Sequence, residues 1–224
     1  MQKTIWVTGI GVASSIGLNV EDSLISFRKG KTGLGNIDIL DTVHKSEFKA
    51  GEIKLTNQEL MQMLEIPPAE YRRHTRTSLI GILAAKQAFS DAGMATDNGI
   101  KTALISATTV GGMDKTELDF AAKNYSSGFI ETHPTGDSTD KIADYLGLSG
   151  YRTTLSTACS SGANAIMHGA RLINQGIVER AIVGGVDALS KFTLNGFNSL
   201  MILDKEYCQP FDKNRRGLNL GEGA

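Results

Sequence analysis

Two cysteines are the side chains in this sequence best suited to nucleophilic chemistry. Cys159 lies in Thr-Ala-Cys-Ser-Ser-Gly, between a strand-like and a helix-like segment, and Cys208 lies in a polar, proline-containing connection. A thiol at a helix start meets the positive end of the helix dipole and unpaired N–H groups, which stabilise the thiolate and could serve as oxyanion donors. Cys159 is therefore either a reactive nucleophile or a buried structural cysteine, and the local pattern leaves both open. For Cys208 we expect no catalytic role, because no helix start follows it.

The four histidines, which could act as bases for a cysteine nucleophile, are His44, His74, His133 and His168. His168 shares the predicted helix with Cys159, but nine helical residues span about 13.5 Å and two and a half turns, which places it on the opposite face. His133 lies in a polar loop, and His44 and His74 lie among charged residues, so we expect all three at the surface. The sequence offers a nucleophile without an evident partner base.

A Gly-x-Gly pattern, Gly9-Ile10-Gly11, follows the strand-like residues 4–8 and could begin a dinucleotide-binding turn. However, the third glycine position holds Ser14, and no strand with an acidic end follows about twenty residues later. We therefore expect Gly9 and Gly11 to form a tight turn after a central strand, and we predict no cofactor.

Composition excludes several other classes of function. The chain has 224 residues, with 23 Lys and Arg against 24 Asp and Glu, so it lacks the basic excess typical of nucleic-acid binding. No run of eighteen apolar residues predicts a membrane span. Two cysteines exclude a disulfide scaffold and a four-cysteine zinc site, and we predict no metal. With no export signal before the first strand-like run, we expect the reducing cytoplasm.

The elements that must position these residues alternate between strand and helix patterns. Strands are predicted at 4–8, 102–106, 153–157 and 180–186, and helices at 20–29, 57–65, 78–92, 115–125, 139–146 and 160–175. Thr56 and Glu59 have capping-box spacing, and Asp137 or Ser138 could cap the helix at 139–146. Residues 195–203 stay unassigned. This alternation predicts one α/β domain over residues 1–224 with a mostly parallel sheet.

Four motifs follow one another in a characteristic order: T-G-I-G-V at 8–12, T-A-C-S-S-G at 157–162, V-G-G-V-D at 183–187, and P-F-D at 210–212 leading to G-E-G-A at 221–224. Together they resemble the N-terminal half of a β-ketoacyl-[acyl-carrier-protein] synthase, the elongating ketosynthase of fatty-acid and polyketide synthesis. The segment R-R-G-L-N-L at 215–220 departs from the common Asp-Gly-Phe ending, so the subfamily stays open.

The resemblance implies a thiolase-like fold, of which residues 1–224 are the N-terminal half, with a mixed five-stranded sheet layered with helices. It implies that Cys159 is the catalytic residue, which takes an acyl chain from a carrier protein, with its backbone N–H as one oxyanion donor. Malonyl carrier protein then loses CO2, and the carbanion attacks the acyl-cysteine to give a 3-oxoacyl product. Val110 and Phe197 match positions that line the acyl pocket; otherwise they are ordinary core residues.

The family's two histidines belong to the C-terminal half, which is absent from this sequence. The implied partners are acyl carrier protein, malonyl carrier protein and a second copy, paired through a strand near residues 153–156. One alternative is a chain-length-factor-like, non-catalytic partner, although such proteins usually lack the nucleophile. Another is a thiolase that acts on coenzyme A thioesters. The surroundings of Cys159 and the segment from 211 to 224 favour the ketosynthase.

Overall fold

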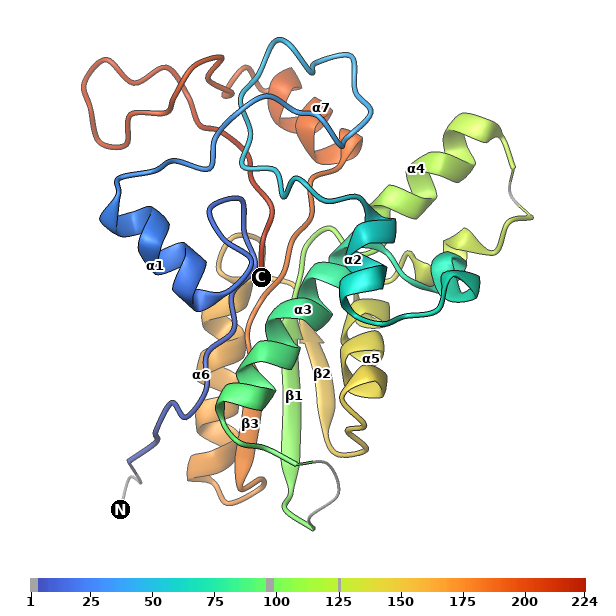
Figure 1. Cartoon of the computed structure of the whole chain (residues 1–224), viewed down its shortest axis with the longest axis vertical. Coiled ribbons are helices and arrows are strands. Elements are labelled where there is room, and N and C mark those ends of the chain that lie inside the picture. Colours follow the sequence, from blue (N-terminus) through green and yellow to red (C-terminus); the bar gives the residue numbers. More distant parts are fainter. Residues whose placement is uncertain (1–3, 96–98, 125) are drawn as a thin grey trace.

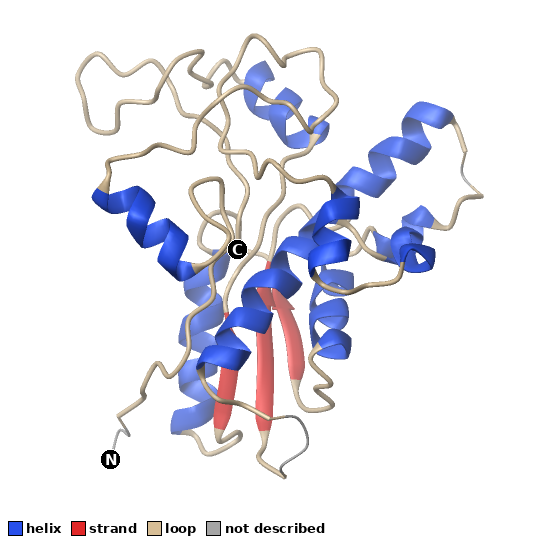
Figure 2. Cartoon of the chain, in the orientation of Figure 1, coloured by secondary structure: helices blue, strands red, loops and turns tan. Residues whose placement is uncertain are grey.

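Three parallel strands form the sheet at the centre of the molecule (Figure 2). The computed structural model describes residues 4–95, 99–124 and 126–224. The strand order is β2 (Arg152–Leu155), β1 (Thr102–Ala107), β3 (Arg180–Val183). All six residues of β1 are buried, as expected for a central strand with helices on both faces. The predicted strands at 102–106, 153–157 and 180–186 are confirmed in place, and the last two are shorter than predicted.

Helices cover both faces of this sheet (Figure 1). Leu104 belongs to the apolar core that contains α3 (Arg76–Asp91) and α5 (Thr135–Tyr145). Its neighbours along β1, Ala103 and Ile105, belong to the core formed with α6 (Ser161–Asn174). Because successive side chains of a strand point to opposite faces, α3 and α5 form one layer and α6 the other. The predicted α/β layering is confirmed.

The remaining elements surround this three-layer unit. They are α1 (Val20–Arg28), α2 (Asn57–Met63), α4 (Met113–Ala122), α7 (Lys191–Ser199) and two short 3-10 helices, η1 (Pro68–Arg73) and η2 (Phe129–Thr132). The predicted capping box is present, because the Thr56 side chain accepts from the Glu59 N–H and the Glu59 carboxylate accepts from the Thr56 N–H. The unassigned residues 195–203 overlap α7.

Three helices begin earlier than predicted, and one of them, α3, starts two residues before the predicted 78–92. α4 starts two residues before the predicted 115–125, and α5 starts four residues before the predicted 139–146. Neither Asp137 nor Ser138 caps α5, because both lie inside the helix and Pro134 holds the N-cap position without a side-chain bond. Proline is preferred near a helix start because its fixed φ suits the first turn, and Pro134 was therefore a further sequence signal for the start of α5.

The prediction of a strand at residues 4–8 is wrong. This segment is extended but pairs with no strand, and Trp6 and Val7 are 79% and 82% exposed. Nor do Gly9 and Gly11 form a tight turn; instead they allow the chain to run directly against α3. A Cβ at Gly9 would lie 2.3 Å from the Ala88 carbonyl oxygen. The glycines are therefore required by close packing against a helix.

The expectation of a mixed five-stranded sheet is also not met in the described part of the chain, where the sheet has three parallel strands. Antiparallel pairing occurs only as isolated bridges. Ala13 and Ala224 exchange two backbone hydrogen bonds, at 3.0 and 2.8 Å, and Gly223 exchanges two with Asp187, at 3.0 and 3.1 Å. Single bridges give too short a ladder to form a strand, although they place residues 223–224 between residue 13 and the segment after β3.

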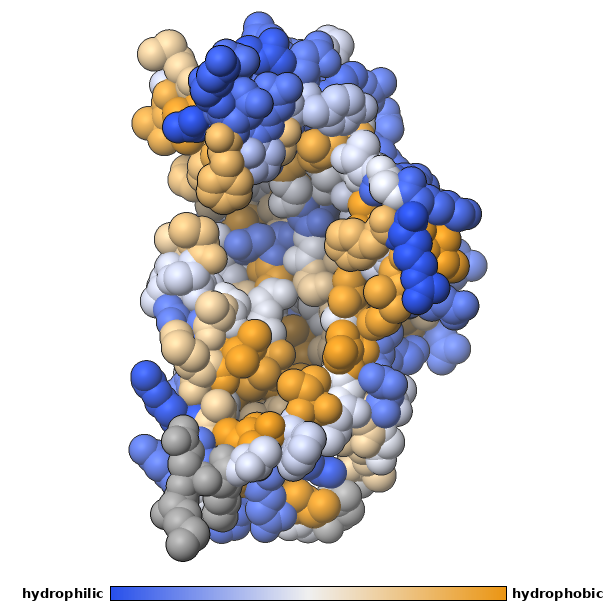
Figure 3. Space-filling view, turned by 90° about the vertical axis from the view of Figure 1, so that its left-hand side faces the viewer, coloured by the Kyte–Doolittle hydropathy of each residue, from blue (hydrophilic) through white to orange (hydrophobic). Residues whose placement is uncertain are grey.

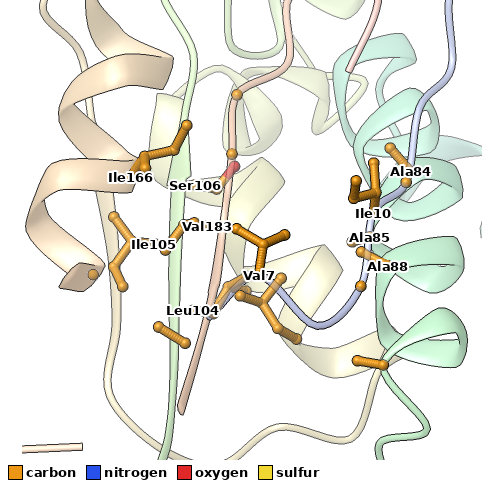
Figure 4. A pocket seen from close by; sticks show the side chains of 18 of the residues that line it. Val7, Ile10, Ala84, Ala85, Ala88, Leu104, Ile105, Ser106, Ile166 and Val183 are labelled. Atoms are coloured by element: carbon orange, nitrogen blue, oxygen red, sulfur yellow. The ribbon is translucent and has the colours of Figure 1, made fainter. Parts of the chain in front are cut away.

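An apolar groove of about 410 Å³ opens beside β3. Figure 3 shows apolar side chains around a hollow in this face of the molecule, and Figure 4 shows the groove from close by. Its walls are residues 5–11, α3, β1, β3 and α6, with Val7, Ile10 and Ile166 among the lining side chains. Ile10 and Ile166 are more than half exposed, so the groove presents apolar surface to solvent.

A buried ion pair joins distant parts of the chain. The Arg76 guanidinium, at the start of α3, donates to both carboxylate oxygens of Glu222, and both side chains are almost fully buried. The Ile53 carbonyl accepts a further bond from Arg76, and the N–H groups of Ile53 and Leu189 donate to Glu222. The Leu55 carbonyl and the Asn57 side chain accept further bonds from the Arg76 guanidinium. A buried charge pair requires such additional hydrogen bonds.

Candidate active site around Cys159

The carboxyl ends of the three strands bring the predicted site segments to one edge of the sheet. The turn with Cys159 follows β2, the Thr108–Val110 segment follows β1, and Asp187 lies four residues after β3. In Figure 1 this edge faces the loops and α7. Open α/β sheets bind ligands at this edge.

Cys159 occupies a sharp turn between β2 and α6. The thiol is exposed and free, which contradicts the alternative of a buried structural cysteine. The preceding residue, Ala158, has φ +52°, a left-handed conformation that costs a non-glycine residue on the order of 1–3 kcal/mol. Helix α6 begins at Ser161, two residues after Cys159, with Ser160 at the N-cap. The predicted position of Cys159 at a strand-to-helix turn is therefore confirmed.

Hydroxyl groups on the first turn of α6 hold this strained turn. The Ser160 hydroxyl donates to the Thr157 carbonyl at 2.7 Å. The Ser161 hydroxyl donates to the Ala158 carbonyl at 2.6 Å and accepts from the Thr157 N–H at 2.8 Å. None of these bonds uses the Cys159 N–H or its thiol, and Cys159 is exposed.

Asp187 anchors the segment that follows β1. Its carboxylate accepts from the hydroxyls of Thr108 and Thr109 at 2.7 and 2.9 Å, and from the N–H groups of Thr109 and Val110 at 2.8 and 3.1 Å. The Thr108 N–H donates to the Leu155 carbonyl at 3.2 Å, which ties this segment to the end of β2. Half-buried Val110 is therefore held at the same edge of the sheet as Cys159.

Phe197 is half-buried on α7, which is fixed by a carboxylate on α4. Glu117 accepts from the N–H groups of Lys191 and Phe192, at 3.1 and 2.6 Å, and so satisfies the first turn of α7. Burial raises the pKa of Glu117, while these two amide bonds act in the opposite direction. Phe197 thus depends on α4, the helix that follows the Val110 segment.

The apolar groove does not gather the predicted site. Its lining residues include none of Cys159, Val110 and Phe197. The role of Val110 and Phe197 in an acyl pocket therefore stays a prediction. Among residues 4–95, 99–124 and 126–224, no three His, Cys, Asp or Glu side chains gather in a way that could hold a metal ion.

No histidine contacts the turn of Cys159 in the described part of the chain. His168 lies 3.2 Å from the Tyr151 hydroxyl, and because Tyr151 immediately precedes β2 while Cys159 follows it, the two sites occupy opposite ends of that strand. His133 bonds to Thr116 at 2.8 Å, next to the glycines at 111–112.

None of the three histidines predicted at the surface is exposed, since His133 is half-buried and the other two are half-buried or buried. His44 is half-buried and bonds to Glu47 at 2.8 Å. His74 is buried, only 6% exposed, because it lies between η1 and the first turn of α3. Burial lowers the pKa of His74, and the charge of Lys141 lowers it further, while Glu70 opposes both. The flanking arginines at 72, 73 and 76 suggested an exposed segment, but Arg76 itself is buried.

Cys208 lies away from any helix start, as predicted. Its N–H donates to the Asn219 side chain at 2.8 Å, and the residue is half-buried. Asp187 and Glu222 are anchoring residues that the sequence alone did not reveal. Both lie inside the motifs named above, and an acidic residue flanked by glycine or apolar residues was the available signal.

None of the helices in the described ranges has the length and apolar character needed to cross a bilayer.

Comparison with known proteins gives a consistent family. The profile described as "Beta-ketoacyl synthase, N-terminal domain" matches residues 2–224. A 3-oxoacyl-[acyl-carrier-protein] synthase 2 from Staphylococcus aureus (strain N315) is 28% identical over 236 residues, which cover 99% of this chain and 56% of the relative. The chain therefore spans about half the length of the curated relatives it matches.

Solved structures agree. The ishigamide ketosynthase/chain length factor superimposes with a TM-score of 0.89 and 28% identity, covering 100% of this chain and 57% of that chain. A ketosynthase in complex with its chain length factor from Xenorhabdus doucetiae gives a TM-score of 0.76 and 25% identity, covering 97% and 55%. The predicted thiolase-like ketosynthase fold is confirmed.

Proposed function

This chain belongs to the family of β-ketoacyl synthase N-terminal domains, and on that premise we propose that Cys159 accepts an acyl group from a carrier-protein thioester. The observation that carries the proposal is the exposed thiol on a strained strand-to-helix turn, within the Thr-Ala-Cys-Ser-Ser-Gly motif. The curated relatives bear the name 3-oxoacyl-[acyl-carrier-protein] synthase 2.

The first step is acyl transfer. The Cys159 thiolate attacks the thioester carbonyl carbon, a new C–S bond forms, and the carbonyl electrons move to oxygen. The backbone N–H of Cys159 is one donor to that oxyanion. When the tetrahedral intermediate collapses, the C–S bond to the carrier breaks, and the carrier thiolate leaves and takes up the proton that Cys159 lost. The acyl chain is then held between the segments of Val110 and Phe197.

The second step is condensation, which needs groups beyond those around Cys159. A malonyl carrier protein loses CO2, and the carbanion attacks the acyl-cysteine to release a 3-oxoacyl product and a free Cys159 thiolate. Developing charge at the malonyl thioester must be stabilised. His168 bonds at the far end of β2, His44 bonds to Glu47, His133 bonds to Thr116, and His74 is buried. Polarising groups typically contribute about 10²–10⁴-fold each, so this chain alone should be acylated but should not condense.

We assign acyl and malonyl carrier proteins as partners, together with a second copy of the chain. The outer edge of β2 is a sheet edge, and a copy related by two-fold symmetry would extend the sheet there. The cytoplasm keeps thiols reduced, so we propose it as the location of a protein that depends on a free Cys159 thiol.

The test of the proposed function is acylation of the purified 224-residue chain by a medium-chain acyl carrier protein, followed by intact-mass and peptide mass spectrometry. We expect one acyl group on Cys159, none in Cys159→Ser, and wild-type behaviour in Cys208→Ser. Addition of malonyl carrier protein should release CO2 only at background level. Acylation of Cys208, or of neither thiol, would refute the nucleophile assignment.

A separate measurement tests the thiol itself. Iodoacetamide should alkylate Cys159 faster than Cys208 in the folded protein, because Cys159 is exposed while Cys208 is half-buried. The ratio of the Cys159 rate to the Cys208 rate should approach one in denaturant, where both thiols are equally accessible. Equal rates in the folded protein would count against the proposal.

The chain-length-factor alternative has one observation in its favour, since solved neighbours include such partners. The exposed Cys159 argues against it, because a non-catalytic partner needs no nucleophile. The same acylation experiment separates the two: a chain-length-factor-like protein stays unmodified while it raises the activity of an added ketosynthase.

A further inference from the structure

Asn164 lies on the second turn of α6 and reaches back over the first turn. Its side-chain Nδ2 donates to the Thr157 hydroxyl at 2.7 Å and approaches the Ser160 hydroxyl at 3.3 Å. Asparagine is a weak helix former, because its amide competes for backbone groups, so a helix interior is not its preferred place. Here the amide instead makes contacts outside its own helix, to the residue that ends the strand segment.

The two residues that Asn164 contacts flank the nucleophile. Thr157 lies two positions before Cys159 and Ser160 one position after it. These two are also joined directly, because the Ser160 hydroxyl donates to the Thr157 carbonyl at 2.7 Å and lies 3.2 Å from the Thr157 hydroxyl. Three side chains therefore form a triangle across the base of the turn, with Cys159 exposed on its outer side.

The turn needs such support. Ala158 holds a left-handed φ of +52°, a conformation that persists only where the surroundings enforce it. Ser161 braces the backbone of residues 157 and 158 from one side. Asn164 contributes the only side-chain bond to the Thr157 hydroxyl that originates beyond the first turn of α6, among the bonds of the described residues.

We propose that Asn164 is a positioning residue for Cys159, whose amide locks Thr157 to Ser160 and so fixes the direction of the thiol and of the Cys159 N–H. This deepens the proposed function and rests on it. Acyl transfer requires the sulfur and an oxyanion donor in one fixed geometry, and a misplacement of about 1 Å can cost roughly 100-fold in rate. Alkylation by a small reagent requires only an accessible thiol.

The two reactions therefore separate positioning from folding. The variants are Asn164→Ala and Asn164→Leu, the second of which keeps the branching at the γ carbon but removes the amide. The matched control is Met167→Ala, an exposed position on the same helix. We expect both Asn164 variants to lose roughly 10- to 100-fold in the maximal rate of acylation of Cys159, with little change in the carrier-protein concentration that gives half that rate. Iodoacetamide labelling should change less than about threefold, and the control should match wild type.

Hydrogen exchange supplies a readout that does not depend on acylation. The hydrogen-bonded amides of Thr157, Ser160 and Ser161 should exchange faster in both Asn164 variants than in the control, while amides of β1 keep wild-type protection. Wild-type acylation in Asn164→Leu would overturn the proposal, and so would a parallel loss of acylation, labelling and β1 protection, since that pattern reports unfolding. If wild type is not acylated at all, the proposed function fails, and unchanged exchange at residues 157, 160 and 161 would then overturn the positioning role on its own.

Discussion

Gly11→Ala tests the close approach between the extended N-terminal segment and α3. A Cβ at this position would lie 1.8 Å from the Ala84 carbonyl oxygen and 2.8 Å from the Ala88 nitrogen. Both atoms belong to helix backbone and cannot move aside, so the segment must lift away from α3. Overpacking costs about 1–3 kcal/mol, and loss of the bond from the Val12 N–H to Gln87 adds about 1 kcal/mol.

The sum is a loss of about 2–4 kcal/mol in the free energy of unfolding, which corresponds to a fall in Tm of roughly 4–16 °C for a chain of this size. Thermal and urea unfolding followed by circular dichroism would measure it. The control is Gly35→Ala, where a Cβ meets nothing within 4 Å and the backbone is not left-handed. That variant should be neutral or about 0.4–1 kcal/mol more stable. Equal stability of the two variants would refute the packing argument.

Three further outcomes are expected. Arg76→Met or Glu222→Leu alone should lower the free energy of unfolding in urea by about 3–5 kcal/mol, because each leaves a buried charge unpaired. The double variant should lower it by much less than the sum, and strict additivity would contradict the pairing. Burial holds the pKa of His74 below its unfolded value of about 6.5, so its stabilising contribution is complete above that pH and is lost as the pH falls through the lowered folded pKa. His74→Gln should therefore flatten the decline in stability below pH 6.5, and an identical slope in both proteins would refute this. Light scattering at tens of micromolar should detect self-association, because the groove beside β3 exposes apolar side chains, and a clean monomer would argue against it.

Local sequence signals predicted the elements whose stability is local. The capping box of Thr56 and Glu59 marked the start of α2, and the apolar run at 102–106 marked the buried β1. The apolar, β-branched residues 4–8 show the same preference for extended backbone, but a strand also needs a neighbour in register. No local pattern reports whether that neighbour is present, so the prediction failed there.

The candidate site divides in the same way. Cys159 was found because its motif places a thiol where a strand gives way to a helix, and His168 was excluded by helical geometry alone. Val110 and Phe197 came only from the resemblance, and the apolar groove beside β3 is lined by neither of them. Asp187 was missed because its four hydrogen bonds reach residues nearly eighty positions away, and Asn164 because an asparagine in a helical segment looks like ordinary composition.

The buried pair of Arg76 and Glu222 has a consequence for the order in which the protein folds. The two residues are 146 positions apart, so their contact is among the least local in the molecule. At about 5–20 residues per second, the ribosome adds Glu222 roughly 7–30 s after Arg76. During that interval the start of α3 can be covered only by burying an unpaired guanidinium, which is strongly unfavourable. The layer formed by α2, α3 and residues 53–57 should therefore close only after Glu222 has been added, and until then its apolar residues are available to chaperones.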